Sequence, residues 1–166
     1  MRRWWIAELA ASVLAMGVAT VPYLVAGHDG SPSPSGLYGH GLGIVGVLLM
    51  LVAEFAYSWR KRPTCFGPGP VSRWMQLHVF CGLVGPYLTF LHSAFRFQGL
   101  AGVLMLLVGV IVVSGMIGRY ARAAAGQPAG ERKSLWYLMH VPLSAALFVL
   151  AIAHVVGALW FGNSVI

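Results

Sequence analysis

Five long apolar runs occupy most of this 166-residue chain and constrain its fold more than any other feature. Each run is long enough to cross the hydrocarbon core of a bilayer as a helix, which takes about 20 residues. Hydrophobic residues make up 58% of the chain and charged residues only 9%, which is too apolar for a soluble protein of this size. The sequence therefore predicts an all-α integral membrane protein with a single transmembrane domain over residues 1–166. The expected spans are residues 4–26, 37–59, 74–95, 100–117 and 135–161.

Lysine and arginine are distributed unevenly between the connections. With a cytoplasmic N-terminus, only Arg96 of the 11 basic residues lies outside. Because basic residues are enriched in cytoplasmic connections, this orientation is strongly favoured. We therefore expect a C-terminus on the periplasmic side and a location in the bacterial inner membrane. The cytoplasmic set is Arg2, Arg3, Arg60, Lys61, Arg62, Arg73, Arg119, Arg122, Arg132 and Lys133.

Several other functions are disfavoured by the sequence. The net charge of +7 does not indicate binding of nucleic acid, because the basic residues form short clusters between apolar runs. Cys65 and Cys81 form no CxxC or CxxCH pattern, so neither a zinc site nor covalent haem attachment is indicated. We interpret Cys65 as a loop thiol and Cys81 as a small core residue. Residues 4–26 follow a charged start as a signal peptide does, but their length favours a retained span.

Four histidines form two pairs inside the apolar runs, His78 with His92 in the third run and His140 with His154 in the fifth. The members of each pair are 14 positions apart. A step of 14 residues brings an α-helix to within about 40° of four whole turns and rises about 21 Å. We therefore expect both histidines of a pair on one helix face, near opposite surfaces of the bilayer.

The third and fifth spans are separated by one helix, so they are expected to run in the same direction. His78 then matches His140 in depth near the cytoplasmic surface, and His92 matches His154 near the outer surface. An iron at each level can take one imidazole from each helix. This arrangement predicts two non-covalent b-type haems with both axial positions filled, which suits the transfer of single electrons.

Two alternatives exist for these histidines. Any one of them could be a polar core residue bonded to a neighbouring helix, although an ionisable residue inside a membrane indicates function by default. A zinc site is the weaker metal hypothesis, because the members of a pair are about 21 Å apart along the axis and no cysteine or carboxylate completes a tetrahedral set.

Other residues are candidates for contacts with haem. Gly82 and Gly85 lie between the ligands of the third span and leave room for a porphyrin, although small residues also serve helix packing. Arg73 and Arg119 on the inner side, and Arg96 on the outer side, are candidate partners for haem propionates. The alternative for Arg96 is a helix-end residue that reaches water.

Two prolines inside the ligand-bearing spans release backbone carbonyls. Pro86 and Pro142 leave the carbonyls of Gly82 and Leu138 without their helical partners, so these carbonyls are candidate acceptors for the second ring N–H of a ligand. The fourth span is apolar except for Ser114 and carries no candidate ligand. We interpret it as scaffold.

A quinone site is a further possibility near each surface. Glu8 and Glu54 are the only carboxylates inside apolar runs, and both lie towards the cytoplasmic side. Either is a candidate for proton relay at a quinone site near the inner haem, or alternatively a carboxylate that reaches the surface or pairs with arginine. His40, at the outer start of the second span, is a similar candidate near the outer haem. This span begins with the glycine-rich YGHGLGIVG, which allows a neighbouring helix to pack closely.

With His78, His92, His140 and His154 in these positions, residues 74–161 resemble the dihaem membrane cytochromes b. This grouping includes the cytochrome b subunit of cytochrome bc complexes and the haem-bearing core of ferric reductases and NADPH oxidases. Their ligands are paired histidines at a similar spacing on one helix and on the next helix but one, and the placement here is most similar to the ferric-reductase grouping. The resemblance implies a haem-binding helix bundle that transfers electrons across the membrane.

The sequence also departs from these families. It has no Gly-rich nucleotide fingerprint after a strand, no sixth helix of the ferric-reductase type and none of the later helices of the cytochrome bc family. We therefore expect electrons to pass through partners, namely the quinone pool and iron-sulfur, flavin or c-type cytochrome subunits of a redox complex. The alternatives are a stand-alone transmembrane ferric or quinone reductase and a non-redox structural or transport subunit.

Overall fold

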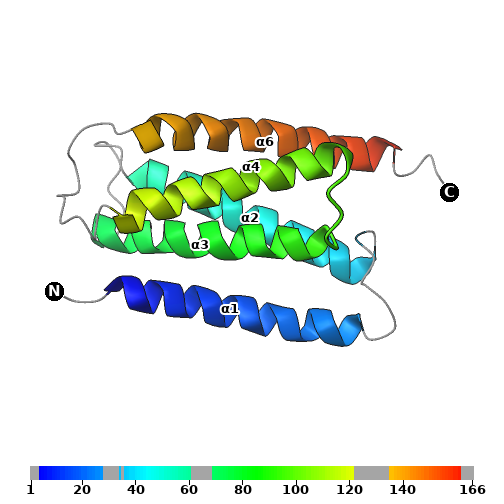
Figure 1. The fold of residues 1–166 in the computed structure, drawn as a ribbon, viewed down its shortest axis with the longest axis horizontal. Coiled ribbons are helices and arrows are strands. Elements are labelled where there is room, and N and C mark those ends of the chain that lie inside the picture. The colour runs from blue at the N-terminus through cyan, green and yellow to red at the C-terminus, as the bar shows by residue number, and fades with distance from the viewer. Residues whose placement is uncertain (1–3, 28–33, 35, 61–68, 122–134, 162–166) are drawn as a thin grey trace. The chain divides into compact units, whose positions relative to one another are not determined.

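A computed structural model describes residues 4–27, 34, 36–60, 69–121 and 135–161 of the chain. Within these residues all regular structure is helical, and five helices are long and apolar enough to cross a membrane (Figure 1). This confirms the all-α architecture with five membrane-length helices. The helices are α1 (Trp4–Ala26), α2 (Leu37–Arg60), α3 (Val71–His92), α4 (Gly99–Met116) and α6 (Leu135–Phe161), with a π-helical segment η1 (Ile117–Ala121) that continues α4.

Helices are the expected response of these apolar runs to lipid, because a helix satisfies its own backbone polar groups. Their outer surfaces are also compatible with a membrane. Leu14, Leu48, Leu106 and Val149 each have more than half of their surface exposed. Such exposure is unfavourable in water but suits contact with lipid tails.

The helix α3 begins three residues earlier than predicted, at Val71 instead of Trp74. The prediction placed residues 60–73 in a connection because of their three leading charges and three prolines. Pro70, in an extended conformation, directly precedes the helix and fixes its start. The exposed Arg73 therefore lies in the first turn, where its side chain can reach water.

The helix α3 also ends three residues earlier than predicted, at His92 instead of Phe95. Ala94 and Phe95 have φ angles of 47° and 60°, in the left-handed region that interrupts an α-helix. The apolar run continues through this turn, so hydrophobicity alone did not reveal it. One consequence is that Arg96 lies beyond the helix and does not share a helical face with His92.

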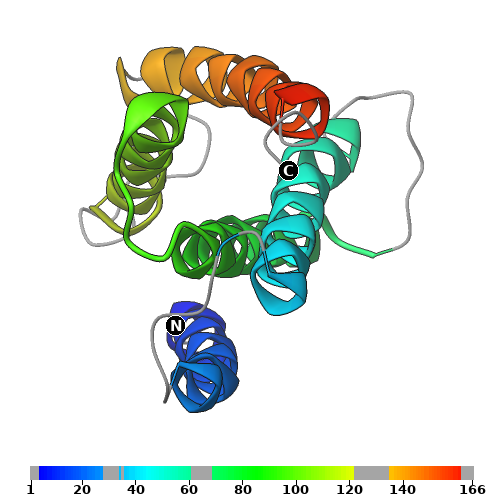
Figure 2. The same ribbon diagram turned by 90° about the vertical axis from the view of Figure 1, so that its right-hand side faces the viewer.

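The helices form two compact units, residues 1–95 and 96–166. In the first unit α3 packs against both α1 and α2, and in the second unit α6 packs against α4 and η1 (Figures 1 and 2). Between α1 and α3, the Tyr87 hydroxyl bonds to Thr20 Oγ1. Since Thr20 donates its own hydrogen to the carbonyl oxygen of Met16, Tyr87 is the donor.

The helices α2 and α3 are in close contact at two glycines. A Cβ atom on Gly46 would lie 2.9 Å from the carbonyl oxygen of Gly85, and a Cβ atom on Gly85 would lie 2.8 Å from that of Gly46. Both distances are too short for a real contact, so this separation requires glycine at both positions. The prediction that the glycine-rich start of α2 allows close packing is confirmed.

Candidate haem-ligand histidines

Both histidines of α3 hydrogen-bond to backbone carbonyls of α2. The Nδ1 atom of His78 lies 2.6 Å from the carbonyl oxygen of Ala53, and Nδ1 of His92 lies 2.8 Å from that of Gly39. A carbonyl oxygen can only accept, so Nδ1 carries a proton in each ring. In the neutral imidazole the lone pair is then on Nε2, the nitrogen that would ligate a metal. We refer to such a bond from Nδ1 as an anchor.

The two anchors are spaced evenly about the glycine contact between α2 and α3. Gly85 lies seven positions from each histidine, and Gly46 lies seven positions from each acceptor residue. Seven residues are within about 20° of two whole turns, so each set of three stays on one helix face. The close approach at the centre therefore brings carbonyls within reach of imidazoles two turns away on either side.

The ring of His92 has two neighbours on α2 besides its acceptor. A Cβ atom on Gly43 would lie 3.0 Å from Cγ and 3.1 Å from Nδ1 of His92, so glycine makes room for the ring. The centroid of the exposed His40 ring lies 6.3 Å from that of His92, with the planes tilted by 56°. The structure thus brings His40 to the His92 end of α3, where the sequence placed both.

Glu54 is close to the other histidine of α3. It follows Ala53, whose carbonyl accepts the anchor of His78, and its side chain is half-buried. Glu54 and His78 are near enough to interact electrostatically. The structure therefore places Glu54 on α2 next to the residue that accepts the hydrogen bond of His78, and its role in proton relay stays a prediction.

In the second unit, the ring of His140 on α6 packs against α4. Its Nδ1 lies 2.9 Å from Ser114 Oγ, and Ser114 Oγ lies 2.8 Å from the carbonyl oxygen of Ile111, to which it donates. A Cβ atom on Gly115 would lie 3.0 Å from Cε1 of His140. The interpretation of this span as scaffold therefore missed a contact with a candidate ligand. The signal that could have revealed it is the presence of one polar residue in an otherwise apolar helix.

The acceptors of these ring N–H groups are not the carbonyls released by proline. For His78 and His92 they lie on α2, and for His140 the contact is with α4. For these three rings the prediction was wrong, because it considered only the helix that carries the ligand. An imidazole projects away from its own helix and reaches the backbone or side chains of a closely packed neighbour.

The two glycines between the α3 histidines differ in their surroundings. A Cβ atom on Gly82 would meet no other atom within 4 Å, so this position can accommodate a bulky neighbour. Gly85, in contrast, is in contact with Gly46 and Met50 of α2. Helix packing accounts for Gly85, whereas the role of Gly82 beside a porphyrin stays a prediction.

The remaining candidates occupy both units. His154 is half-buried on α6, 14 positions after His140. Arg96 is exposed in the connection after α3. Arg119 is half-buried in η1, a π-helical segment that contacts α6, and such segments are frequent at functional sites. Cys81 is buried at 2% exposure, which confirms its interpretation as a core residue. Outside the described residues lie Arg2, Arg3, Lys61, Arg62, Cys65, Arg122, Arg132 and Lys133.

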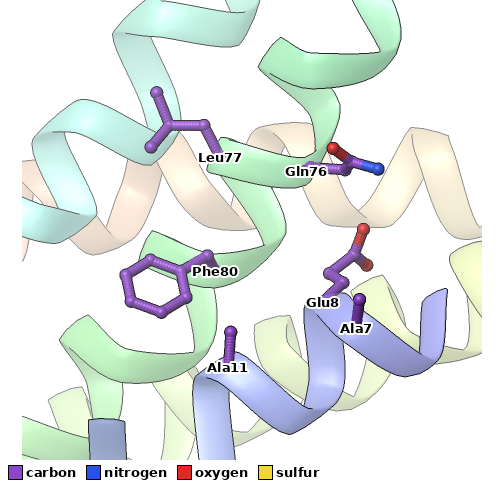
Figure 3. A pocket seen from close by; sticks show the side chains of 6 residues that line it. All are labelled: Ala7, Glu8, Ala11, Gln76, Leu77 and Phe80. Carbon is purple, nitrogen blue, oxygen red and sulfur yellow. The ribbon is translucent and has the colours of Figure 1, made fainter. Parts of the chain in front are cut away.

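A pocket of about 420 Å³ lies between α1 and α3 (Figure 3). Glu8 is buried at 7% exposure, and its carboxylate lies on the same side of the pocket as the Gln76 amide, while Leu77 and Phe80 form an apolar side. Gln76 and Leu77 directly precede His78. Polar groups and an apolar wall are thus combined near the first histidine of α3. The lining residues are Ala7, Glu8, Ala11, Gln76, Leu77 and Phe80.

Within the described part of the chain, no three side chains of His, Cys, Asp or Glu gather as a metal site. The candidate ligands are instead single imidazoles, as axial ligation of haem iron requires. No protein-family model, curated protein or solved structure matches the chain.

Proposed function

We propose that this protein is a dihaem b-type cytochrome that transfers electrons across a membrane as a subunit of a quinone-linked redox complex. The observation that carries the proposal is the contact of His78, His92 and His140 through Nδ1 with neighbouring helices. Metal-ligating histidines almost always donate the other ring N–H in this way. A structural histidine can use either ring nitrogen, so the use of Nδ1 by all three rings favours ligation.

In this proposal His78 and His140 hold the inner haem, and His92 and His154 hold the outer haem. A haem held by these histidines would supply one-electron transfer. The role of the protein in these sites is to hold the ligand rings in a fixed orientation before the cofactor binds. Rings that are already oriented lose less conformational freedom on ligation, which strengthens binding.

Cationic side chains complete the proposed haem sites. Arg73 in the first turn of α3 and Arg119 in η1 are the candidates to bind the propionates of the inner haem, and Arg96 is the candidate for the outer haem. Arg119 has the strongest support of the three, because it is half-buried on a segment that contacts α6. The guanidinium group suits a carboxylate because it can donate two parallel hydrogen bonds.

The proposed location is the bacterial inner membrane with a cytoplasmic N-terminus. The bias of basic residues supports this orientation. Alkaline phosphatase fused after Ile166 is expected to be active, because the fusion would place it in the periplasm. Green fluorescent protein fused at the same position is expected to be dark, and the reverse pattern would contradict the proposed orientation.

We assign the pocket between α1 and α3 to a quinone headgroup. A ligand that enters between membrane helices comes from the lipid, and an apolar wall with few polar groups is the usual composition of a small-molecule site. The Glu8 carboxylate and the Gln76 amide are the groups in the lining that can bond to ring oxygens. Oxidation of a quinol releases two protons with its two electrons, and Glu8 can accept one of them.

Two matched substitutions test the quinone assignment. Glu8→Gln is expected to slow quinol oxidation by about 10²-fold, the lower range for loss of a proton-transfer group. Glu54→Gln tests the other candidate for proton relay, because Glu54 lies on α2, outside the pocket lining. If Glu54→Gln slows the reaction and Glu8→Gln does not, the site belongs beside Glu54 instead.

A pyridine haemochrome assay with a redox titration of the purified protein tests the proposal as a whole. We expect two b-type haems per chain and two reduction steps. A colourless protein would contradict the proposal and favour a structural or transport subunit. Purified protein that reduces ferric chelates or oxidises quinol without other subunits would favour a stand-alone reductase.

A further inference from the structure

The contact between His140 and Ser114 forms a short chain of hydrogen bonds. Ser114 Oγ lies 2.8 Å from the carbonyl oxygen of Ile111 and 2.9 Å from Nδ1 of His140. A hydroxyl group has one hydrogen, and a carbonyl oxygen can only accept. When the hydroxyl donates to Ile111, it must therefore accept from Nδ1 of His140. This direction places the ring proton on Nδ1 and the lone pair on Nε2.

The neighbouring residue fits the same ring. Gly115 lies against the Cε1 edge of His140, and a Cβ atom there would approach to 3.0 Å. Ser114 and Gly115 together contact the imidazole of His140. The Ser114 hydroxyl contacts Nδ1, and the absence of a side chain at Gly115 leaves room for Cε1. Ser114 is also the one polar side chain of Gly99–Met116 in α4. This isolated hydroxyl lies within hydrogen-bond distance of the His140 ring.

We infer that Ser114 is a positioning residue that holds the proton of His140 on Nδ1 and thereby tunes the haem that His140 binds. This inference rests on the proposed function. A hydroxyl oxygen is the acceptor here, whereas His78 and His92 donate to backbone carbonyls. Groups that accept from a ligand ring raise its basicity and fix its orientation. Loss of the Ser114 acceptor is therefore expected to weaken ligation and to raise the reduction potential of that haem.

The first test reads the tautomer of His140 without any cofactor. Nitrogen-15 NMR of haem-free protein, with His140 assigned from a His140→Gln variant, distinguishes protonation at Nδ1 from protonation at Nε2. We expect the Nδ1–H form in the wild-type protein and a mixture of both forms in Ser114→Ala. A wild-type ring protonated at Nε2 would overturn the inference, whether or not the protein binds haem.

The second test measures haem affinity and reduction potential in Ser114→Ala, in Ser114→Thr and in a control variant. Ser114→Ala is expected to reduce affinity at the His140 site by about 10–100-fold, as do changes in groups that orient metal ligands. The haem that still binds at the His140 site is expected to have a higher reduction potential. The affinity and the potential of the haem at the other site are expected to be unchanged. Ser114→Thr keeps the hydroxyl and is expected to restore both properties.

Ser144→Ala is the matched control, because Ser144 is a buried serine on α6 whose hydroxyl donates to the backbone carbonyl of His140 instead of the ring. We expect no change in potential for this variant. Equal effects of Ser144→Ala and Ser114→Ala, or no rescue by Ser114→Thr, would overturn the inference. Wild-type protein that binds no haem would contradict the proposed function, and the NMR result would still decide the role of Ser114.

Discussion

The two units of the molecule hold their candidate ligands in different ways. In the first unit, His78 and His92 donate to backbone carbonyls of α2, and a glycine contact midway between them sets the helix separation. In the second unit, His140 contacts the Ser114 side chain on α4. A backbone acceptor survives substitution of its residue, whereas a side-chain acceptor does not. The second unit is therefore the one in which a single substitution can remove the acceptor of a ligand ring without moving a helix.

The largest expected effect comes from breaking the glycine contact of the first unit. In Gly46→Leu the new side chain would meet Thr89 and the backbone of Gly85, where even a Cβ atom lies within 2.9 Å. Separation of α2 from α3 would remove both anchors, so we expect both haems to be lost and stability to fall by about 3 kcal/mol, the upper range for overpacking. Haem content per chain measures the result.

Gly17→Leu is the matched control for this substitution. A Cβ atom on Gly17 of α1 would meet no other atom within 4 Å, so a leucine there would face the surroundings of the helix. We expect normal haem content in this variant. Retention of both haems in Gly46→Leu would contradict the role given to the α2–α3 contact.

A smaller and more selective effect is expected from two further glycines. Gly43→Ala would press on the His92 ring, and Gly115→Ala would press on the His140 ring, each from about 3.0 Å. We expect each variant to bind one haem about tenfold more weakly, the lower range for changes around a metal ligand. A redox titration should show the outer step altered in Gly43→Ala and the inner step altered in Gly115→Ala. An identical effect on both steps in either variant would remove the distinction between the sites.

The smallest effect is expected when the side chain at a backbone acceptor is removed. Ala53→Gly leaves the carbonyl that accepts from His78 in place, so we expect unchanged haem spectra and potentials. The cost is limited to the lower helix preference of glycine, roughly 0.5–1 kcal/mol. Thermal unfolding measures the loss of stability, and a redox titration measures the haem potentials. A shift in potential as large as that of Ser114→Ala would show that the two units do not differ in the proposed way.

The sequence was sufficient to predict the helices and to place the two histidines of each pair on the same helix. Hydrophobic length determines a membrane helix, and α1 and α6 have the predicted bounds. The turn after His92 was not predictable in this way, because the left-handed conformations of Ala94 and Phe95 occur in residues without a turn signature. Hydropathy therefore located the spans and missed where α3 ends.

The partners of the histidines could not be predicted, because they depend on which helices pack together and in which register. Ser114 was visible as an isolated polar residue, but only the packing of α4 against α6 connects it with His140. Likewise, Glu8 was a candidate from the start, whereas Gln76 joins it only through the register of α1 on α3. The sequence was enough to identify the candidate side chains, but not to predict which of them contact one another.

Redox titration of four single variants, His78→Ala, His140→Ala, His92→Ala and His154→Ala, tests the central claim most directly. If paired imidazoles from α3 and α6 hold two haems, His78→Ala and His140→Ala will each remove the same reduction step. His92→Ala and His154→Ala will each remove the other step. Loss of the same step in His78→Ala and His154→Ala, with the other step intact, would contradict the pairing.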